Sequence, residues 1–255
     1  MQIFSSNPRG WKARELSNEE IEKFQENLAK YNIGPVIIHA PYLINLASPK
    51  EDLYQKSITA LKEQVDRANK IEADYLVLHP GSHTGGGEEK GRQRIIAALN
   101  EILKNKTLDF QLLLENVAGA GTALGTTIEE LGIIYDNLID ASQVGICFDT
   151  CHGFAGGYNL KNDNEVNDLL AAIDEVFGLD KLGVIHANDC KGDLGSNKDR
   201  HHHIGQGKIG KLGFENLVNH PQLKDKPFIL ETPIDEEGDD ESNLAVIRDL
   251  VEEND

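Results

Sequence analysis

The stretch VGICFD at Val144–Asp149 decides the fold class, because it is a short apolar run that ends in a charged residue. Short apolar runs recur along the whole chain, with stretches of helical pattern between them. The seven runs are Gln2–Ser5, Val36–His39, Tyr75–His79, Phe110–Glu115, Val144–Asp149, Leu182–His186 and Pro227–Glu231. Strands that alternate with helices predict an α/β fold with a parallel sheet and right-handed crossovers.

The intervening helices carry their own start signals. The S/T-x-x-E capping box, in which side chains satisfy the free amides of the first turn, occurs at Ser17–Glu20, Ser48–Glu51 and Thr126–Glu129. The second of these expected helices has an apolar stripe that predicts packing on the sheet. The stripe comprises Tyr54, Ile58, Leu61, Val65 and Ala68.

The chain ends in an acidic segment, Asp235–Asp255. Within it, Leu244, Ile247 and Leu250 have the spacing of a last amphipathic helix, while Glu252–Asp255 are expected to be a solvated end.

Length and composition favour one large core. A chain of 255 residues with 39% hydrophobic content suits a single α/β barrel, so residues 1–255 are expected to form one domain. No apolar run has the roughly 18 residues of a membrane helix, and no secretory leader is recognisable. The three cysteines, Cys147, Cys151 and Cys190, are too few for a disulfide framework. These features predict a soluble cytoplasmic protein with no membrane partner.

The formal charge of −18 argues against a nucleic acid partner, because phosphate binding normally requires a basic surface. Two considerations weaken the argument. Carboxylates that hold metal ions are counted in this charge without their metals, and eight basic residues fall in expected loops. These are Arg9, Lys12, Arg14, Lys191, Lys198, Arg200, Lys208 and Lys211.

Polar residues close six of the expected strands: His39, His79, Glu115, Asp149, His186 and Glu231. The strand period of two places an apolar residue below each of them on the same face: Ile37, Val77, Leu113, Cys147, Val184 and Ile229. In a parallel β/α barrel the carboxyl ends of the strands converge on one mouth, where the chemistry lies. We therefore expect the six polar side chains to lie together.

Acidic and imidazole groups that converge in a buried mouth require compensation, and metal ions provide it. Imidazole and carboxylate donors favour Zn²⁺, with Mn²⁺ or Fe²⁺ as alternatives. His152, Asp199 and His201 raise the number of donors to nine, which suits about three zinc ions if one carboxylate bridges. A lone histidine in an apolar strand is usually a satisfied core residue, but the joint placement favours metal binding. Cys147 and Cys151 are interpreted as packing residues.

Seven sequence blocks resemble the endonuclease IV family, a family of zinc-dependent AP endonucleases. They are HAPYLINLAS at His39–Ser48, LHPGSH at Leu78–His83, LLENVAGAGTALG at Leu113–Gly125, VGICFDTCHGFAGGY at Val144–Tyr158, HANDCKGDLGS at His186–Ser196, DRHHHIGQGKIG at Asp199–Gly210 and LETP at Leu230–Pro233. The blocks span the chain in the family's order. Cys190 is a departure, because Ser or Ala is expected at that position.

The resemblance implies a TIM-type β/α barrel with three zinc sites. One zinc ion would be held by His39, His79 and Glu115. Glu115 would also bridge to a second zinc ion, and this implied second set is completed by Asp149, His186 and Glu231. The third implied set is His152, Asp199 and His201.

The resemblance further implies hydrolysis of double-stranded DNA on the 5′ side of abasic sites and trimming of blocked 3′ ends. The zinc ions would activate the attacking water and neutralise the phosphate oxygens, with Glu115, Asp149 and Glu231 as the catalytic carboxylates. Arg9, Tyr42 and Leu43 match positions that wedge into DNA, where planar or apolar side chains replace lost stacking.

The chain departs from the family at its start. The family's first strand and helix, roughly 30 residues in an eight-unit barrel, precede the segment that matches MQIFSSNPRGW. Seven strands are therefore expected, with the N-terminal βα unit missing. A monomer is expected, with self-association through the exposed edges of the barrel as the alternative. Two other functions stay open: a metal-dependent sugar isomerase or epimerase on a related barrel, and an inactive homologue that binds damaged DNA.

Overall fold

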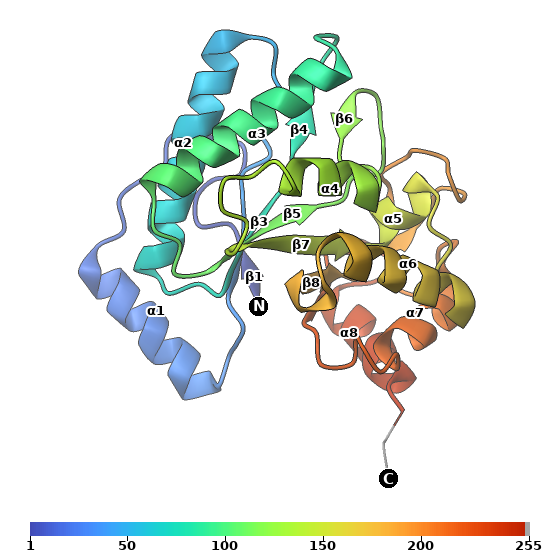
Figure 1. The fold of residues 1–255 in the computed structure, drawn as a ribbon. Helices are drawn as coiled ribbons and strands as arrows, with labels where there is room; N and C mark the ends of the chain where they lie inside the picture. Colours follow the sequence, from blue (N-terminus) through green and yellow to red (C-terminus); the bar gives the residue numbers. More distant parts are fainter. Residues whose placement is uncertain (253–255) are drawn as a thin grey trace. The chain divides into compact units, whose positions relative to one another are not determined.

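The computed structural model describes residues 1–252, and its backbone forms two compact units. The first unit comprises Met1–Glu115 and Ile133–Gly145, and the second comprises Asn116–Gly132 and the chain from Ile146 onward. Strands and helices alternate in both units (Figure 1). The predicted alternation is therefore confirmed, while the single domain stays a prediction.

The first unit contains four parallel strands in the order β1-β2-β3-β5. Its strands are β1 (Gln2–Ile3), β2 (Ile37–His39), β3 (Tyr75–Leu78), the short β4 (Gly81–Ser82) and β5 (Gln111–Glu115). Its helices are α1 (Asn18–Tyr31), α2 (Glu51–Lys70) and α3 (Glu88–Asn105), in blue to green in Figure 1. β1 ends at Ile3, two residues earlier than the sequence predicts.

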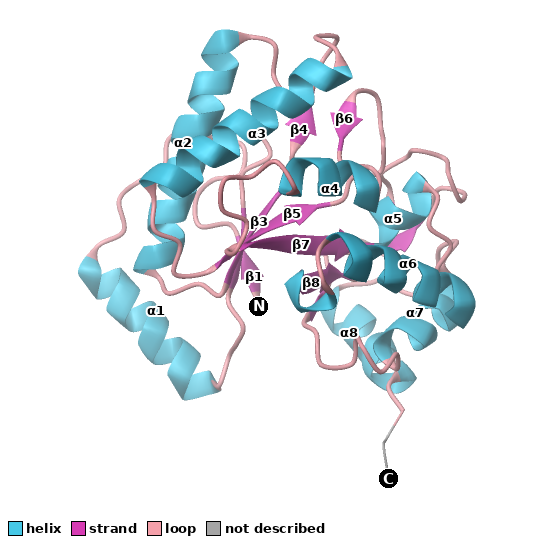
Figure 2. Ribbon diagram, in the orientation of Figure 1, coloured by secondary structure: helices cyan, strands magenta, loops and turns pink. Residues whose placement is uncertain are grey.

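The second unit contains the parallel strands β7-β8-β11 and helices that follow them (Figure 2). Its strands are β6 (Ala123–Leu124), β7 (Val144–Asp149, whose first two residues belong to the first unit), β8 (Leu182–His186), β9 (Asp189–Cys190), β10 (His201–His202) and β11 (Phe228–Ile229). Its helices are α5 (Thr150–Gly156), α6 (Asp163–Val176), the 3₁₀ turn η1 (Leu179–Lys181), α7 (Gly210–Val218) and α8 (Asp240–Leu250). α4 (Ile128–Tyr135) begins in this unit and ends in the first.

One of the three predicted capping boxes is confirmed. Ser17 and Glu20 cap α1 reciprocally, because the side chain of each accepts from the backbone amide of the other. The box at Ser48 is wrong: α2 begins after Lys50, which makes no side-chain cap, and the buried Ser48 hydroxyl accepts from the Lys50 amide instead. The box at Thr126 is displaced by one residue. There the Thr127 hydroxyl accepts from the Glu130 amide.

The predicted core is confirmed in its main elements. All five residues of the α2 stripe are buried. Five of the six apolar residues expected beneath the strand-end polar groups are fully buried: Ile37, Val77, Leu113, Cys147 and Val184. Ile229 is only half-buried, because β11 is a two-residue strand whose described neighbour in the parallel pairing is β8.

The terminal helices are less covered than α2. α1 has no buried residue, and Leu244 in α8 is 40% exposed although the last helix forms where the sequence predicts it. Glu252 is exposed, and the rest of the expected solvated end lies outside the described residues. Lys211 lies in α7 and not in a loop, which corrects that expectation. None of the described helices is long and apolar enough to cross a membrane.

Candidate metal centre

Three predicted ligands converge in the first unit. His39 ends β2, His79 follows β3 directly, and Glu115 ends β5. Oε2 of Glu115 lies 3.0 Å from Nε2 of His39 and 3.0 Å from Nε2 of His79. His39 and Glu115 are buried, and the two imidazole rings meet edge to face. Neighbouring parallel strands therefore bring two ring nitrogens to one buried carboxylate oxygen.

The hydrogen bond at Nδ1 of His39 determines which of its two ring nitrogens carries the proton. Nδ1 lies 2.8 Å from the carbonyl oxygen of Ala40, which can only accept, so Nδ1 carries the proton. A neutral imidazole then presents an unprotonated Nε2 to the Glu115 carboxylate. Two lone pairs 3.0 Å apart repel each other unless a cation lies between or beside them. The site thus fits a metal ion, with an imidazolium as the alternative.

A second set lies at the ends of the strands in the second unit. Nδ1 of His186 is 3.4 Å from Oε2 of Glu231 and 4.0 Å from Oδ2 of Asp149. His186 and Asp149 are completely buried, and Glu231 follows β11 by two residues. The three side chains can each offer one ligand atom to a common ion.

The third set lies beside the second. Nε2 of His152 is 3.4 Å from Oδ2 of Asp199, and Nε2 of His201 is 3.4 Å from Oδ1 of the same carboxylate. Nε2 of His201 is also 3.8 Å from Oδ2 of Asp149. The Asp199 side chain is half-exposed, so this set opens toward solvent.

Backbone carbonyls orient the two histidines of the third set. Nδ1 of His152 donates to the carbonyl oxygen of Asn116 at 3.0 Å, and Nδ1 of His201 donates to that of Glu231 at 3.0 Å. Both rings therefore present Nε2 as an acceptor toward Asp199, as His39 does toward Glu115. A hydrogen bond on the far ring nitrogen is the usual way in which proteins orient metal-binding histidines.

Asp149 explains why VGICFDTCH folds as a strand followed at once by a helix. Its Oδ1 accepts from the His152 amide at 2.7 Å and caps α5. Gly153 in α5 lies so close to the Phe148 ring that a Cβ there would come 2.3 Å from Cζ. Oδ1 of Asp149 therefore caps α5, while Oδ2 of the same carboxylate faces His186 in the second ligand set.

Two asparagines fix the Asp149 backbone and side chain. Asn116 accepts from the Asp149 amide at 2.7 Å and donates to the Asp149 carbonyl oxygen, so it fixes the backbone of a predicted ligand. Asn188 was not anticipated. Its Nδ2 donates to Oδ2 of Asp149 at 2.6 Å, and its Oδ1 accepts from the Glu231 amide at 2.8 Å. Its place two residues after the polar strand end His186 was the available signal.

Asp189 is a second buried polar residue whose role the sequence did not show. Its carboxylate accepts from the amides of Cys190, Gly207 and Ile209 at 2.8–3.0 Å. It thereby holds the loop that follows β10. This loop carries part of the block DRHHHIGQGKIG. Gly207 allows the close approach of the loop to Asp189, because a Cβ there would lie 2.4 Å from Oδ1 of Asp189.

The three predicted DNA-contact residues lie in loops of the first unit. Tyr42 is 59% exposed, with its ring 5.8 Å from that of His39 and edge-on to Phe4. Arg9 is exposed, and Leu43 is half-buried. Tyr42 therefore adjoins the first ligand set, whereas no contact described for Arg9 ties it to that set.

Cys151 and Cys190 are buried free cysteines. Interaction with the Cys190 thiol, together with burial, raises the pKa of Cys151 far above its ordinary value. Interaction with Cys151 lowers the pKa of Cys190. The burial of Cys151 agrees with its interpretation as a packing residue.

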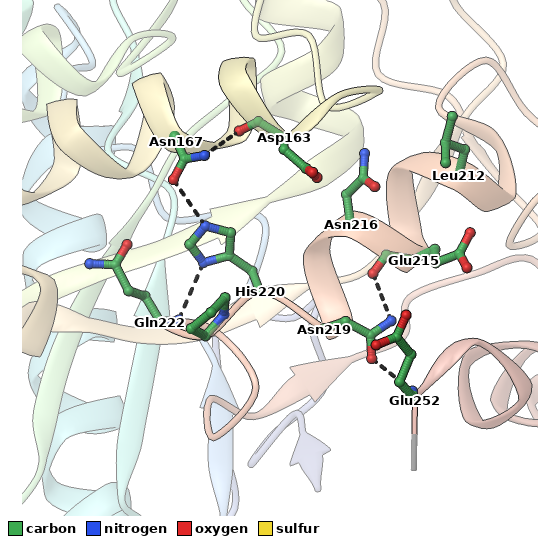
Figure 3. A pocket seen from close by; sticks show the side chains of 10 residues that line it. Asp163, Asn167, Leu212, Glu215, Asn216, Asn219, His220, Gln222 and Glu252 are labelled. Carbon is green, nitrogen blue, oxygen red and sulfur yellow. Dashed lines mark hydrogen bonds between the residues drawn. The ribbon is translucent and has the colours of Figure 1, made fainter. Parts of the chain in front are cut away.

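The other histidines lie outside the three sets. His203 is buried, and its ring nitrogens contact Asp235 and Asn243 at 2.9 Å. The hydrogen bond from His203 lowers the pKa of the Asp235 carboxyl below its ordinary value. His220 lines a groove of about 710 Å³ between α6 and α7, where it contacts Asn167 at 3.2 Å (Figure 3). None of the predicted metal ligands lines this groove.

Comparison with known proteins identifies close relatives. The family described as xylose isomerase-like TIM barrel matches residues 1–250. A probable endonuclease 4 of Halothermothrix orenii is 51% identical over 233 residues, which cover 91% of this chain and 84% of the relative. A probable endonuclease 4 of Methanoculleus marisnigri is 46% identical, over 98% of this chain and 89% of the relative. The crystal structure of endonuclease IV from Thermus thermophilus superposes with a TM-score of 0.83 at 37% identity, covering 98% of this chain and 87% of that one.

Proposed function

The chain belongs to the endonuclease 4 family of xylose isomerase-like TIM barrels, and we propose that it is a zinc-dependent phosphodiesterase that cuts DNA on the 5′ side of abasic sites and trims blocked 3′ ends. The predicted barrel fold and the predicted family are thereby confirmed. The substrate, the number of metal ions and the roles of single residues belong to the proposal.

The orientation of the histidines carries the proposal. His39, His152 and His201 each donate from Nδ1 to a backbone carbonyl and direct Nε2 at a carboxylate. The arrangement of His39 and Glu115 would be costly without a cation, because a lone pair and a negative charge would face each other in buried surroundings. The nine donors fall into three sets of three, which supports three zinc ions.

Three carboxylates have proposed roles in catalysis. Zinc ions, when bound, supply a water of lowered pKa and positive charge for the phosphate oxygens. Asp149 and Glu231 are held by Asn188, which limits their movement. Glu115 lies within reach of both His39 and His79. These three carboxylates are the proposed catalytic residues, because they would position the metal ions against the phosphate.

Recognition of DNA is proposed to use exposed loops in each unit. Lys191 and Arg200 are exposed and are joined by a backbone hydrogen bond at 2.9 Å, directly beside Cys190 and His201. Two cations there would contact phosphates despite the negative net charge of the chain. Tyr42, Leu43 and Arg9 would fill the gap left by the missing base.

The test is cleavage of a duplex oligonucleotide with one abasic site. Metal-loaded protein is expected to nick this strand on the 5′ side, to leave a 3′-hydroxyl that a polymerase extends, and to leave an undamaged duplex intact. Glu231→Gln is expected to abolish nicking, whereas Glu237→Gln, which changes an exposed acid nearby in sequence, leaves it unchanged. Nicking of undamaged DNA at the same rate would contradict the substrate assignment.

Two alternatives have distinct outcomes in the same experiment. Turnover of ketoses by metal-loaded protein without nicking would identify a sugar isomerase or epimerase. Binding of abasic DNA without nicking would identify an inactive homologue. The third ligand set, His152, Asp199 and His201, favours the nuclease, because isomerases of related barrels typically require fewer ions.

We further propose a cytoplasmic monomer. Light scattering of the protein in solution measures the mass directly. A mass of 28.1 kDa is expected, and a dimer would favour association through barrel edges.

A further inference from the structure

The segment between β1 and α1 is basic in an otherwise acidic chain. Residues 1–14 contain Arg9, Lys12 and Arg14 but no acidic residue, whereas the formal charge of the whole chain is −18. Arg14 pairs with Glu20 at 2.6 Å. Arg9 and Lys12 are exposed and form no ion pair with any of residues 1–252. Residues 5–14, the basic loop, therefore offer two cations to an anionic partner.

The base of the basic loop adjoins the first ligand set. β1 runs parallel to β2, with Ile3 opposite Ile38, so the chain leaves β1 at the edge of the sheet where His39 lies. The ring of Phe4, which directly precedes the basic loop, lies 5.6 Å from the His39 ring. A DNA strand held at the first ligand set would therefore pass close to the basic loop.

One buried side chain joins the two ends of the basic loop. Arg67 lies in α2 and is 8% exposed. Its Nε donates to the Ser5 hydroxyl at 3.0 Å, and its Nη2 donates to the Ser5 carbonyl oxygen. Its Nη1 donates to the Arg14 carbonyl oxygen at 2.7 Å. The Arg67 guanidinium thus closes the basic loop at both ends.

Gln64, which lies one turn before Arg67 in α2, adds to this closure. Its buried side chain accepts from the Ser5 hydroxyl at 2.7 Å and donates to the Ser6 hydroxyl at 3.2 Å. A buried cation is costly unless its donors are satisfied, and the hydrogen bonds of Arg67 all go to uncharged oxygens. Closure of the basic loop therefore explains the guanidinium better than neutralisation of an acid does.

We propose that Arg67 is a positioning residue for DNA recognition, because it closes the basic loop and so holds Arg9 and Lys12 where they contact the DNA backbone. An open loop would sample many conformations, and DNA binding would then cost the free energy of ordering it. Arg67 is buried and acts only through the loop. The closure of the loop can be tested by itself, whereas its role toward DNA rests on the proposed function.

Trypsin tests the closure without reference to DNA. The native protein is digested briefly, and mass spectrometry follows cleavage after Arg9, Lys12 and Arg14, with cleavage after Lys104 in α3 as the internal reference. Arg67→Ala is expected to accelerate cleavage in the basic loop at least about tenfold, the effect of losing one hydrogen bond to a charged group. The rate at Lys104 is expected to stay unchanged. Unchanged cleavage of the loop, or equal acceleration at Lys104, would overturn the proposal.

Two further variants make the result specific. Arg94→Ala is the matched control, because it removes a guanidinium that stacks on Tyr54 and pairs with Glu51, and it should leave cleavage of the loop unchanged. Arg67→Lys keeps the charge and most of the stem, so it serves if Arg67→Ala does not fold. One ammonium cannot replace the fork of a guanidinium, so cleavage of the loop should again be faster than in the wild type. Full protection of the loop in Arg67→Lys would contradict closure by the guanidinium.

Steady-state kinetics with an abasic duplex test the role toward DNA. Arg67→Ala is expected to raise KM while kcat and zinc content stay unchanged. The slope of log KM against log salt concentration is expected to fall by about one for each phosphate contact that is lost. Removal of both loop cations, Arg9→Ala with Lys12→Ala, is expected to have the same effects.

The combined variant shows whether Arg67 acts through the loop cations. Addition of Arg67→Ala to the variant that lacks Arg9 and Lys12 is expected to change KM no further. A further rise in KM, or an unchanged KM in Arg67→Ala alone, would overturn the role toward DNA. Absence of nicking by the wild-type protein would instead count against the proposed function, because the trypsin rates do not depend on it.

Discussion

Replacement of Asn188 by alanine tests how the protein positions its proposed metal ligands. The side chain is completely buried and makes a 2.6 Å hydrogen bond to Oδ2 of Asp149 and a 2.8 Å hydrogen bond from the Glu231 amide. Loss of both leaves buried polar groups unsatisfied, at a cost of about 2–4 kcal/mol in the free energy of unfolding. Groups that orient metal ligands contribute about 10–100-fold in metal affinity, or about 1.4–2.8 kcal/mol.

The matched control is Asn243→Ala. Asn243 is also buried and hydrogen-bonded, to the Ile204 amide, the His203 ring and the Asp239 carbonyl, but it contacts none of the predicted ligands. Both variants should lose stability in thermal melts, whereas only Asn188→Ala should lose zinc affinity in titrations against a competing chelator. Equal zinc affinity in the two variants would refute the positioning role of Asn188.

Four further perturbations follow from the structure. Arg14 and the Ser17 amide lower the pKa of Glu20 from 4.5 to about 2. Glu20 therefore stabilises the fold above pH 4.5, and this contribution is lost as the pH falls toward 2. Glu20→Gln should lower the melting temperature at pH 7 but not near pH 2, and an equal shift at both pH values would contradict this. Gly153→Ala places a Cβ 2.3 Å from the Phe148 ring and should destabilise the protein by about 1–3 kcal/mol in denaturant unfolding, whereas Gly10→Ala meets only ordinary contacts and should have little effect. Tyr42→Ala should raise KM for an abasic duplex without changing the zinc content. Tyr31→Ala, which removes a comparably exposed ring from α1, should leave KM unchanged. Equal effects of the two substitutions would contradict a role of Tyr42 in DNA recognition. Chelation should lower the melting temperature and added zinc should restore it, because only the folded state brings the ligands together; an unchanged melting temperature would argue against a structural contribution of the metal.

The strands and the ligand sets could be predicted because both depend on local patterns. A polar residue at the end of an apolar run is visible in VGICFD, and parallel pairing brings such ends together within each unit. His39 and His79 come together because β2 and β3 pair in register. The same holds for Asp149 and His186, which are direct register partners in β7 and β8.

The hydrogen bonds that complete the site could not be predicted in the same way. Asn188 connects Asp149 with Glu231, which lie 82 residues apart in the chain, and no spacing rule relates these positions. Ser48 failed as a cap because its hydroxyl is buried and accepts from the Lys50 amide ahead of the helix. The methyl group of Thr126 lies against Gly119 and Gly156, while the hydroxyl of Thr127 makes the cap. In these cases packing determined which of several suitable side chains was used.

Metal stoichiometry linked to cleavage tests the central claim most directly. Native mass spectrometry of zinc-reconstituted protein, with abasic-site nicking measured on the same sample, is predicted to show three zinc ions per chain and nicking that disappears as zinc is removed. Full nicking by protein that carries no metal, or a zinc-loaded protein with fewer than three ions and full activity, would contradict the account.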